Sequence, residues 1–178
     1  LPVGADAEVS GMVPSHRHPH IYWTVGDSGN AASIYPVRLQ SGLSPQSGAA
    51  TRLPPAPGIS VTNAANRDWE DITRDAHGHL IIADLGNNSN ARLDLCLYFV
   101  DEPDLDAPQT APARSLMLEY PDQTDYPSPR DRFNFDAEAV FTIGDAIFVL
   151  TKHRSDTFTS MYKVTDPASD HGSSLEYV

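Results

Sequence analysis

The sequence has a single cysteine, Cys96, among its 178 residues, so no disulfide can form within the chain. Cys96 lies in the apolar run Leu93 to Val100, where a small buried hydrophobic residue is a more common role than a reactive thiol. No apolar run is long enough to cross a membrane as a helix, and no segment keeps a long helical period. These absences argue against a disulfide-stabilised scaffold and against a membrane-spanning helix.

Basic residues are also few, with 12 Lys and Arg against 24 Asp and Glu and a formal net charge of -12. Such a field repels phosphate backbones and anionic membranes, so we expect no nucleic-acid partner, whereas metal ions, amines and basic peptides would be attracted. The chain begins at Leu1 rather than at Met, which predicts a removed signal segment or a trimmed chain. We therefore expect a secreted or periplasmic protein.

Several motifs that identify enzymes are absent from the sequence: a Gly-x-Ser-x-Gly elbow, a Walker loop, His-Glu-x-x-His and a cysteine pair. Histidines alternate between Ser15 and His20, a spacing that could bind zinc on a strand. Pro19 would interrupt such a strand, and solvated histidines in a turn are the favoured interpretation.

What the sequence does contain is 15 Pro and 11 Gly scattered among short apolar runs, which is typical of many strands joined by turns. With 40% hydrophobic and 20% charged residues, the chain suits one globular unit over residues 1–178. The pattern predicts an all-β fold with strands at 8–13, 21–25, 33–39, 69–73, 80–84, 93–100, 114–119, 146–150 and 161–164.

An internal repeat organises these strands. Each copy has an acidic residue, a hairpin, an apolar strand and a second polar turn, and the copies cover about 7–45, 62–104 and 114–166, with a further strand starting at 174–178. The acids that open the copies, Glu8, Glu70 and Glu138, are 62 and 68 residues apart. A period of this size predicts a β-propeller or a related array.

The repeated motifs are Glu8-Val9-Ser10-Gly11, Asp27-Ser28-Gly29, Asp68-Trp69-Glu70-Asp71-Ile72, Asp84-Leu85-Gly86-Asn87-Asn88 and Asp136-Ala137-Glu138-Ala139. With them the chain resembles about the first half of a six-bladed β-propeller. The superfamily includes gluconolactonases, regucalcin, strictosidine synthases and esterase-like or phytase-like secreted bacterial propellers. This resemblance implies about three blades, with the missing propeller half supplied by the same polypeptide or by a second copy. In the gluconolactonase-like branch a first-blade glutamate binds calcium, and Glu8 stands in the matching place.

In a propeller, equivalent positions of successive inner strands form a ring at the axial channel. Glu8, Glu70 and Glu138 are therefore expected to converge, and an oxygen-rich ring suits Ca²⁺. Further ligand-binding residues are expected at the ends of the neighbouring strands: Asp27, Asp84, Asn87, Asn88 and Lys152. Alternatively, the repeated acids accept hydrogen bonds from backbone N–H groups or lie in a water-filled channel.

The functional expectation is an exported protein whose acidic axial site binds a small molecule with calcium. The activity would be hydrolysis of an ester, lactone or phosphoester. The alternative is a non-catalytic binding or interaction module. No residue is assigned a catalytic role, because fold does not determine activity.

Overall fold

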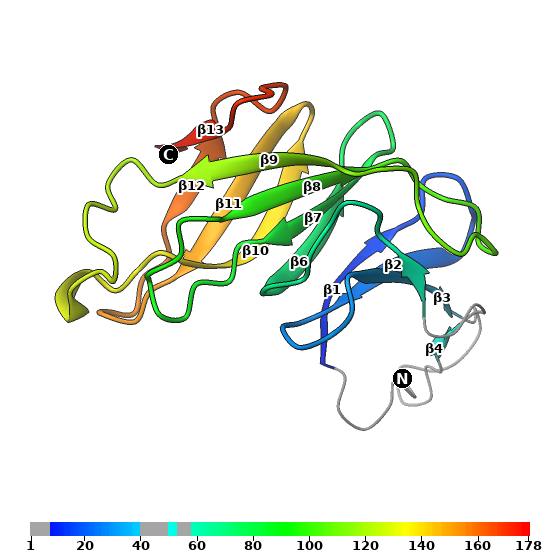
Figure 1. Ribbon diagram of the computed structural model, residues 1–178, viewed down its shortest axis with the longest axis horizontal. Coiled ribbons are helices and arrows are strands. Elements are labelled where there is room, and N and C mark those ends of the chain that lie inside the picture. The colour runs from blue at the N-terminus through cyan, green and yellow to red at the C-terminus, as the bar shows by residue number, and fades with distance from the viewer. Residues whose placement is uncertain (1–7, 40–49, 53–57) are drawn as a thin grey trace.

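The computed structural model describes residues 8–39, 50–52 and 58–178, and within them the protein is all-β, as expected (Figure 1). It has no α-helix in that part of the chain, and one 3₁₀ turn, η1 (Arg130–Arg132). The first sheet is an antiparallel path in chain order: β1 (Val9–Pro14), β2 (Ile21–Gly26), β3 (Ser33–Leu39) and β4 (Ala50–Arg52). The short strand β5 (Ile59–Ser60) also pairs with β3.

A second sheet has eight strands in the order β10-β11-β12-β13-β9-β8-β7-β6. In chain order these strands are β6 (Trp69–Arg74), β7 (Leu80–Asp84), β8 (Cys96–Val100), β9 (Arg114–Glu119), β10 (Asp136–Ile143), β11 (Ala146–Lys152), β12 (Met161–Val164) and β13 (Ser173–Tyr177). Each pair of neighbours is antiparallel except β13 and β9, which pair in parallel.

The second sheet curls into a nearly closed barrel, because its two outermost strands, β6 and β10, lie against each other. The Val140 backbone N–H donates a hydrogen bond of 2.9 Å to Asp71 Oδ2, and the Thr142 hydroxyl donates one of 2.8 Å to the Arg74 carbonyl. Hydrogen bonds from side chains therefore join β6 to β10, in place of the backbone ladder that would close the barrel fully. Closure covers edges that would otherwise be free to pair with other chains.

The expectation of a six-bladed propeller is wrong. Separate blades would keep β6–β9 and β10–β13 as two sheets, but Ser173 and Ser174 of β13 pair with Leu118 and Glu119 of β9 and join them into one. Residues 174–178 are likewise not the start of a further blade, since β13 is paired on both sides. The ends expected for the first repeat, at residues 7 and 45, lie outside the described residues.

Strand β7 separates two hydrophobic cores, and all five of its residues are buried. Ile81 and Ala83 face the barrel interior, which is filled by side chains from β7 to β13, while Leu80 and Ile82 face the first sheet. Period-two alternation explains the division, and the continuous apolar run in the sequence is the expected pattern for a strand buried on both faces.

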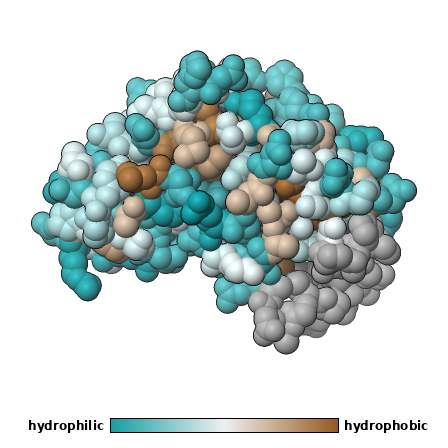
Figure 2. Space-filling model, in the orientation of Figure 1, coloured by the Kyte–Doolittle hydropathy of each residue, from teal (hydrophilic) through white to brown (hydrophobic). Residues whose placement is uncertain are grey.

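The core between the two sheets contains two fully buried tryptophans, Trp23 on β2 and Trp69 on β6. Strand β1 approaches β6 closely, because Gly11 has no side chain: a Cβ there would lie 2.6 Å from the Ile72 backbone nitrogen. On the face shown in Figure 2, hydrophilic residues predominate and apolar residues form only small patches.

Candidate metal-binding site

Three hairpins, β1–β2, β6–β7 and β10–β11, share a β-bulge near the start of their first strand. The pairing shifts between Val9 and Gly11, between Trp69 and Asp71, and between Ala137 and Ala139. A bulge inserts one unpaired residue and redirects its side chain, and it is common at the margin of a functional site. The repeat found in the sequence is therefore real at the level of these hairpins, although the hairpins do not build propeller blades.

The bulges give the structural alignment of the repeat. The residues at the bulge are Ser10, Glu70 and Glu138, so Glu70 and Glu138 are equivalent, as expected. Glu8 is instead equivalent to Asp68, the residue before the first paired position of its hairpin. The sequence alignment placed the first copy two residues out of register, because the bulge position of that copy holds Ser10 and not an acidic residue.

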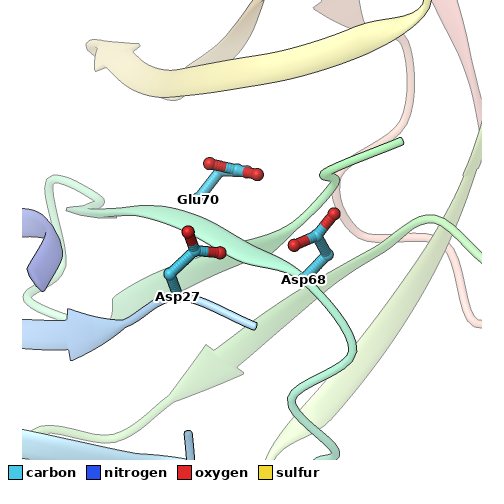
Figure 3. A group of neighbouring side chains, drawn as sticks. All are labelled: Asp27, Asp68 and Glu70. Atoms are coloured by element: carbon cyan, nitrogen blue, oxygen red, sulfur yellow. The ribbon is translucent and has the colours of Figure 1, made fainter. Parts of the chain in front are cut away.

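The structure brings together three carboxylates, from Asp27, Asp68 and Glu70 (Figure 3). One oxygen from each can be chosen so that all three lie within 4.8 Å of one another, and all three residues are half-buried. Asp27 follows β2, Asp68 precedes β6, and Glu70 lies on β6. In the part of the chain that is described, no other group of three or more His, Cys, Asp or Glu residues could hold a metal ion, and the alternating histidines near His18 form no such group.

Asn66 holds the two sheets together at this point. Its Nδ2 donates to the backbone carbonyls of Gly26 and Asp27, at 2.9 and 3.0 Å, and its Oδ1 accepts from the Trp69 N–H at 3.1 Å. The Asp27 N–H also donates to the Glu8 carbonyl, at 3.1 Å. The turn that carries Asp27 is thereby fixed against the start of β6, although Glu8 itself keeps an exposed side chain.

Negative charge accumulates at this cluster. Burial, followed by the charges of Glu138, Asp27, Asp68 and Asp136, raises the pKa of Glu70 to about 8. The pKa of Asp68 is raised as well, first by burial and then by the charge of Asp27. Among the described residues, no Lys or Arg forms an ion pair with the three clustered carboxylates. Carboxylates this close to one another cannot all be ionised without a large free-energy cost, unless one of them is protonated or a cation lies between them.

Glycine at position 86 makes room for the cluster. A Cβ at Gly86 would lie directly against the carboxyl oxygens of Asp68 and Glu70. The Gly86 N–H also donates to the Asp68 carbonyl at 3.1 Å, which holds this turn beside the start of β6. The glycine of the Asp84-Leu85-Gly86 motif is therefore explained by close approach to the two acids.

The other residues expected at the site have partners of their own. Lys152 Nζ lies 2.9 Å from Glu138 Oε1, and Arg92 Nη1 lies 3.0 Å from the buried Asp84 carboxylate. Asn87 is buried, and its side chain donates to the Phe135 carbonyl at 3.0 Å.

Asn88 is exposed and borders the cluster. Its Nδ2 donates to Asp68 Oδ2 at 3.4 Å, and its Oδ1 accepts from Arg154. Of the expected metal ligands Glu8, Glu70 and Glu138, only Glu70 belongs to the cluster. Glu138 lies close enough to raise the pKa of Glu70, but its charge is partly compensated by Lys152.

Sequence reasoning did not identify Asp68 as a site residue. The available signal was its spacing from Glu70, since residues two apart on a strand face the same side. Asp27 was expected near the site as a ligand-binding residue, and the structure places it among the clustered carboxylates.

No protein family, curated protein or solved structure was found to match the chain. The class that the structure defines is thus an all-β protein with a nearly closed eight-stranded barrel and an acidic cluster where its two sheets meet. Within the described ranges there is no helix with the length and apolar character needed to cross a lipid bilayer.

Proposed function

We propose that the protein binds a hard divalent cation, with Ca²⁺ as the expected ion, through Asp27, Asp68 and Glu70. The observation that supports this is the approach of three carboxylates to within 4.8 Å of one another. Calcium binds oxygen at about 2.3 to 2.6 Å, so ligands on opposite sides of the ion lie about 5 Å apart. The three acids could supply up to six oxygens, and water would complete the usual six to eight.

In this proposal the cation and a proton compete for the same site. With a pKa of about 8, Glu70 holds a proton at neutral pH when no cation is bound. A bound cation would lower the pKa of Glu70, because attraction to the ion replaces repulsion between the carboxylates. Calcium binding should therefore release a proton from Glu70, and its affinity should rise between pH 6 and pH 8.

The cluster joins the two sheets, so its proposed role is to hold them together and to present an ion to a ligand. This role is the non-catalytic alternative among the expected functions, and it requires no residue of the cluster to react. A site with three carboxylates suits the low affinities of extracellular calcium modules, about 0.1 to 1 mM. We accordingly keep a secreted or periplasmic location as part of the proposal.

Isothermal titration calorimetry with CaCl₂ tests the proposal. Titrations in two buffers of different ionisation enthalpy at pH 7 should show proton release on binding, and the Glu70→Gln variant should bind at least ten-fold more weakly. Glu176→Gln, which removes one exposed charge from β13, is the control for net charge. Glu138→Gln separates the three-residue cluster from the expected ring of glutamates, and it should change affinity less than Glu70→Gln.

Two results would contradict the proposal. The first is the absence of saturable binding at millimolar CaCl₂. The second is binding that Glu70→Gln and Glu176→Gln weaken equally, since this would show only the effect of net charge.

A further inference from the structure

A second arrangement of reactive groups lies in the loop between β11 and β12, outside the acidic cluster. His153 Nδ1 is 2.7 Å from Asp156 Oδ1, and His153 Nε2 is 2.8 Å from the Ser160 hydroxyl oxygen. One imidazole thus bridges a carboxylate and a serine hydroxyl. This is the arrangement that activates serine as a nucleophile, and such sites are identified by geometry and not by sequence order.

The serine is held in place by the strands that flank the loop. The Thr151 N–H donates to the Ser160 carbonyl at 3.0 Å, and the Ser160 N–H donates to the Thr151 hydroxyl at 3.3 Å. The His153 side chain is only 11% exposed. The base and the nucleophile are therefore the loop residues next to the ends of β11 and β12, two paired strands that fix their separation.

The hydrogen bonds select the tautomer that the chemistry needs. A carboxylate only accepts hydrogen bonds, so Nδ1 of His153 donates to Asp156, and in the neutral imidazole Nε2 is then the nitrogen that can accept from the Ser160 hydroxyl. The Phe158 N–H also donates to Asp156 Oδ1, at 2.8 Å. This backbone bond, and then the bond from His153, lower the pKa of Asp156, so its carboxylate stays ionised.

An open depression lies beside the imidazole. It is lined by His153, Thr157, Phe158 and Thr159 of the loop together with Leu150 and the ion-paired Glu138 and Lys152. Phe158 is 71% exposed and offers an apolar surface to a substrate beside the imidazole. The net charge of -12 disfavours anionic substrates. Together these features favour a small, uncharged ester.

We propose that Ser160 and His153 are catalytic residues for the hydrolysis of small uncharged carboxylic esters, with Asp156 as the positioning residue. The Ser160 oxygen attacks the ester carbonyl carbon while His153 Nε2 takes the hydroxyl proton. The tetrahedral intermediate expels the alcohol, which receives that proton from Nε2, and an acyl-serine remains. Water then attacks the acyl carbon and gives a proton to Nε2. Release of the carboxylic acid returns this proton to the Ser160 oxygen.

A fluorophosphonate probe tests the nucleophile directly, because it reacts covalently with activated serines. After incubation of the full chain with the probe, peptide mass spectrometry should find one adduct, on Ser160. Labelling should be lost in Ser160→Ala and fall at least 100-fold in rate in His153→Gln, the contribution expected of a general base. Ser174→Ala, which removes an exposed hydroxyl on β13, should label like the wild type. Hydrolysis of p-nitrophenyl acetate should follow the same order of variants.

The role of Asp156 needs a readout that loop stability alone would not change. In ¹⁵N NMR, His153 should show a protonated Nδ1 and an unprotonated Nε2, and Asp156→Asn should disturb this tautomer and slow labelling while the melting temperature is retained.

Should Ser160→Ala fail to fold, Ser160→Cys keeps a nucleophile at the same place, and its alkylation by iodoacetamide should depend on His153. Absence of an adduct on Ser160, or labelling that is unchanged in His153→Gln, would overturn the proposal. The three residues would then serve only to order the loop.

Discussion

The raised pKa of Glu70 makes stability depend on pH in a direction opposite to that of most acidic residues. The folded state holds a proton on Glu70 up to about pH 8, whereas the unfolded chain loses it near the ordinary value of 4.5. Between these two values the folded state binds more protons, so the free energy of unfolding contributed by this group falls as pH rises. The loss is complete above about pH 8.

The size of the effect follows from the same values. A shift of one pKa unit corresponds to about 1.4 kcal/mol, so a fully buried group whose pKa rises from 4.5 to about 8 would lower the free energy of unfolding by roughly 5 kcal/mol once it is ionised. Glu70 is only half-buried, and solvent screening reduces the figure to about 2 kcal/mol. Glu70→Gln removes the ionising group, so in EDTA it should be more stable than the wild type at pH 8 by about 2 kcal/mol, and equal to it near pH 4.

Urea denaturation at pH 4, 6 and 8, with EDTA and with 10 mM CaCl₂, measures this difference. Calcium should stabilise the wild type at pH 8 by about 2.7 kcal/mol when its concentration is 100 times the dissociation constant, and should stabilise Glu70→Gln, which binds at least ten-fold more weakly, by about 1.4 kcal/mol or less. Glu176→Gln again serves as the charge control. If the wild type and Glu70→Gln show the same dependence on pH in EDTA, the charge interactions assigned to the cluster are incorrect.

Three further substitutions test separate parts of the structure. Gly86→Ala places a methyl group against the clustered carboxylates and should weaken calcium binding at least ten-fold by calorimetry, since the acids must move apart. Arg92→Leu leaves the Asp84 carboxylate, which is 1% exposed, without its ion pair, and should lower the free energy of unfolding by about 3 kcal/mol. As the control, Arg17→Ala breaks an exposed ion pair and should change the free energy of unfolding by less than about 1 kcal/mol. Tyr120→Phe removes a buried hydroxyl that has no hydrogen-bond partner among the described residues and should leave stability unchanged or raise it by about 1 kcal/mol in thermal melts. A loss above that size would show that the hydroxyl has a partner.

The two sites differ in how they arise from the chain. The acidic cluster is built from the turn after β2 and the start of β6, which Asn66 links across the two sheets. The proposed nucleophile, base and positioning residue all come from one loop. Loss of the first site should therefore accompany any separation of the sheets, while the second should persist as long as the β11–β12 hairpin is intact.

The sequence by itself determined the strands and hairpins, because both depend on neighbours along the chain. Period-two alternation and turn residues placed β3, β7, β9 and β12 at the residues the structure shows. The same local signal revealed three similar hairpins. Asp27 and Glu70 were expected near one site through the ring of a propeller, and the structure brings them together in a different fold.

Only the tertiary structure decided how the hairpins are assembled. The parallel pairing of Ser173 and Ser174 with β9 turns two expected blades into one barrel, and this contact depends on lateral hydrogen bonds that leave no periodic trace in the sequence. The bulge at Ser10 fixed the register of the first repeat, and so separated Glu8 from Glu70. The approach of His153 to Ser160 depends on the conformation of a loop, which hydrophobic pattern does not encode. Local propensity thus determined the strands and hairpins, whereas strand-edge pairing, the register at the bulges and loop conformation determined which side chains meet at the two sites.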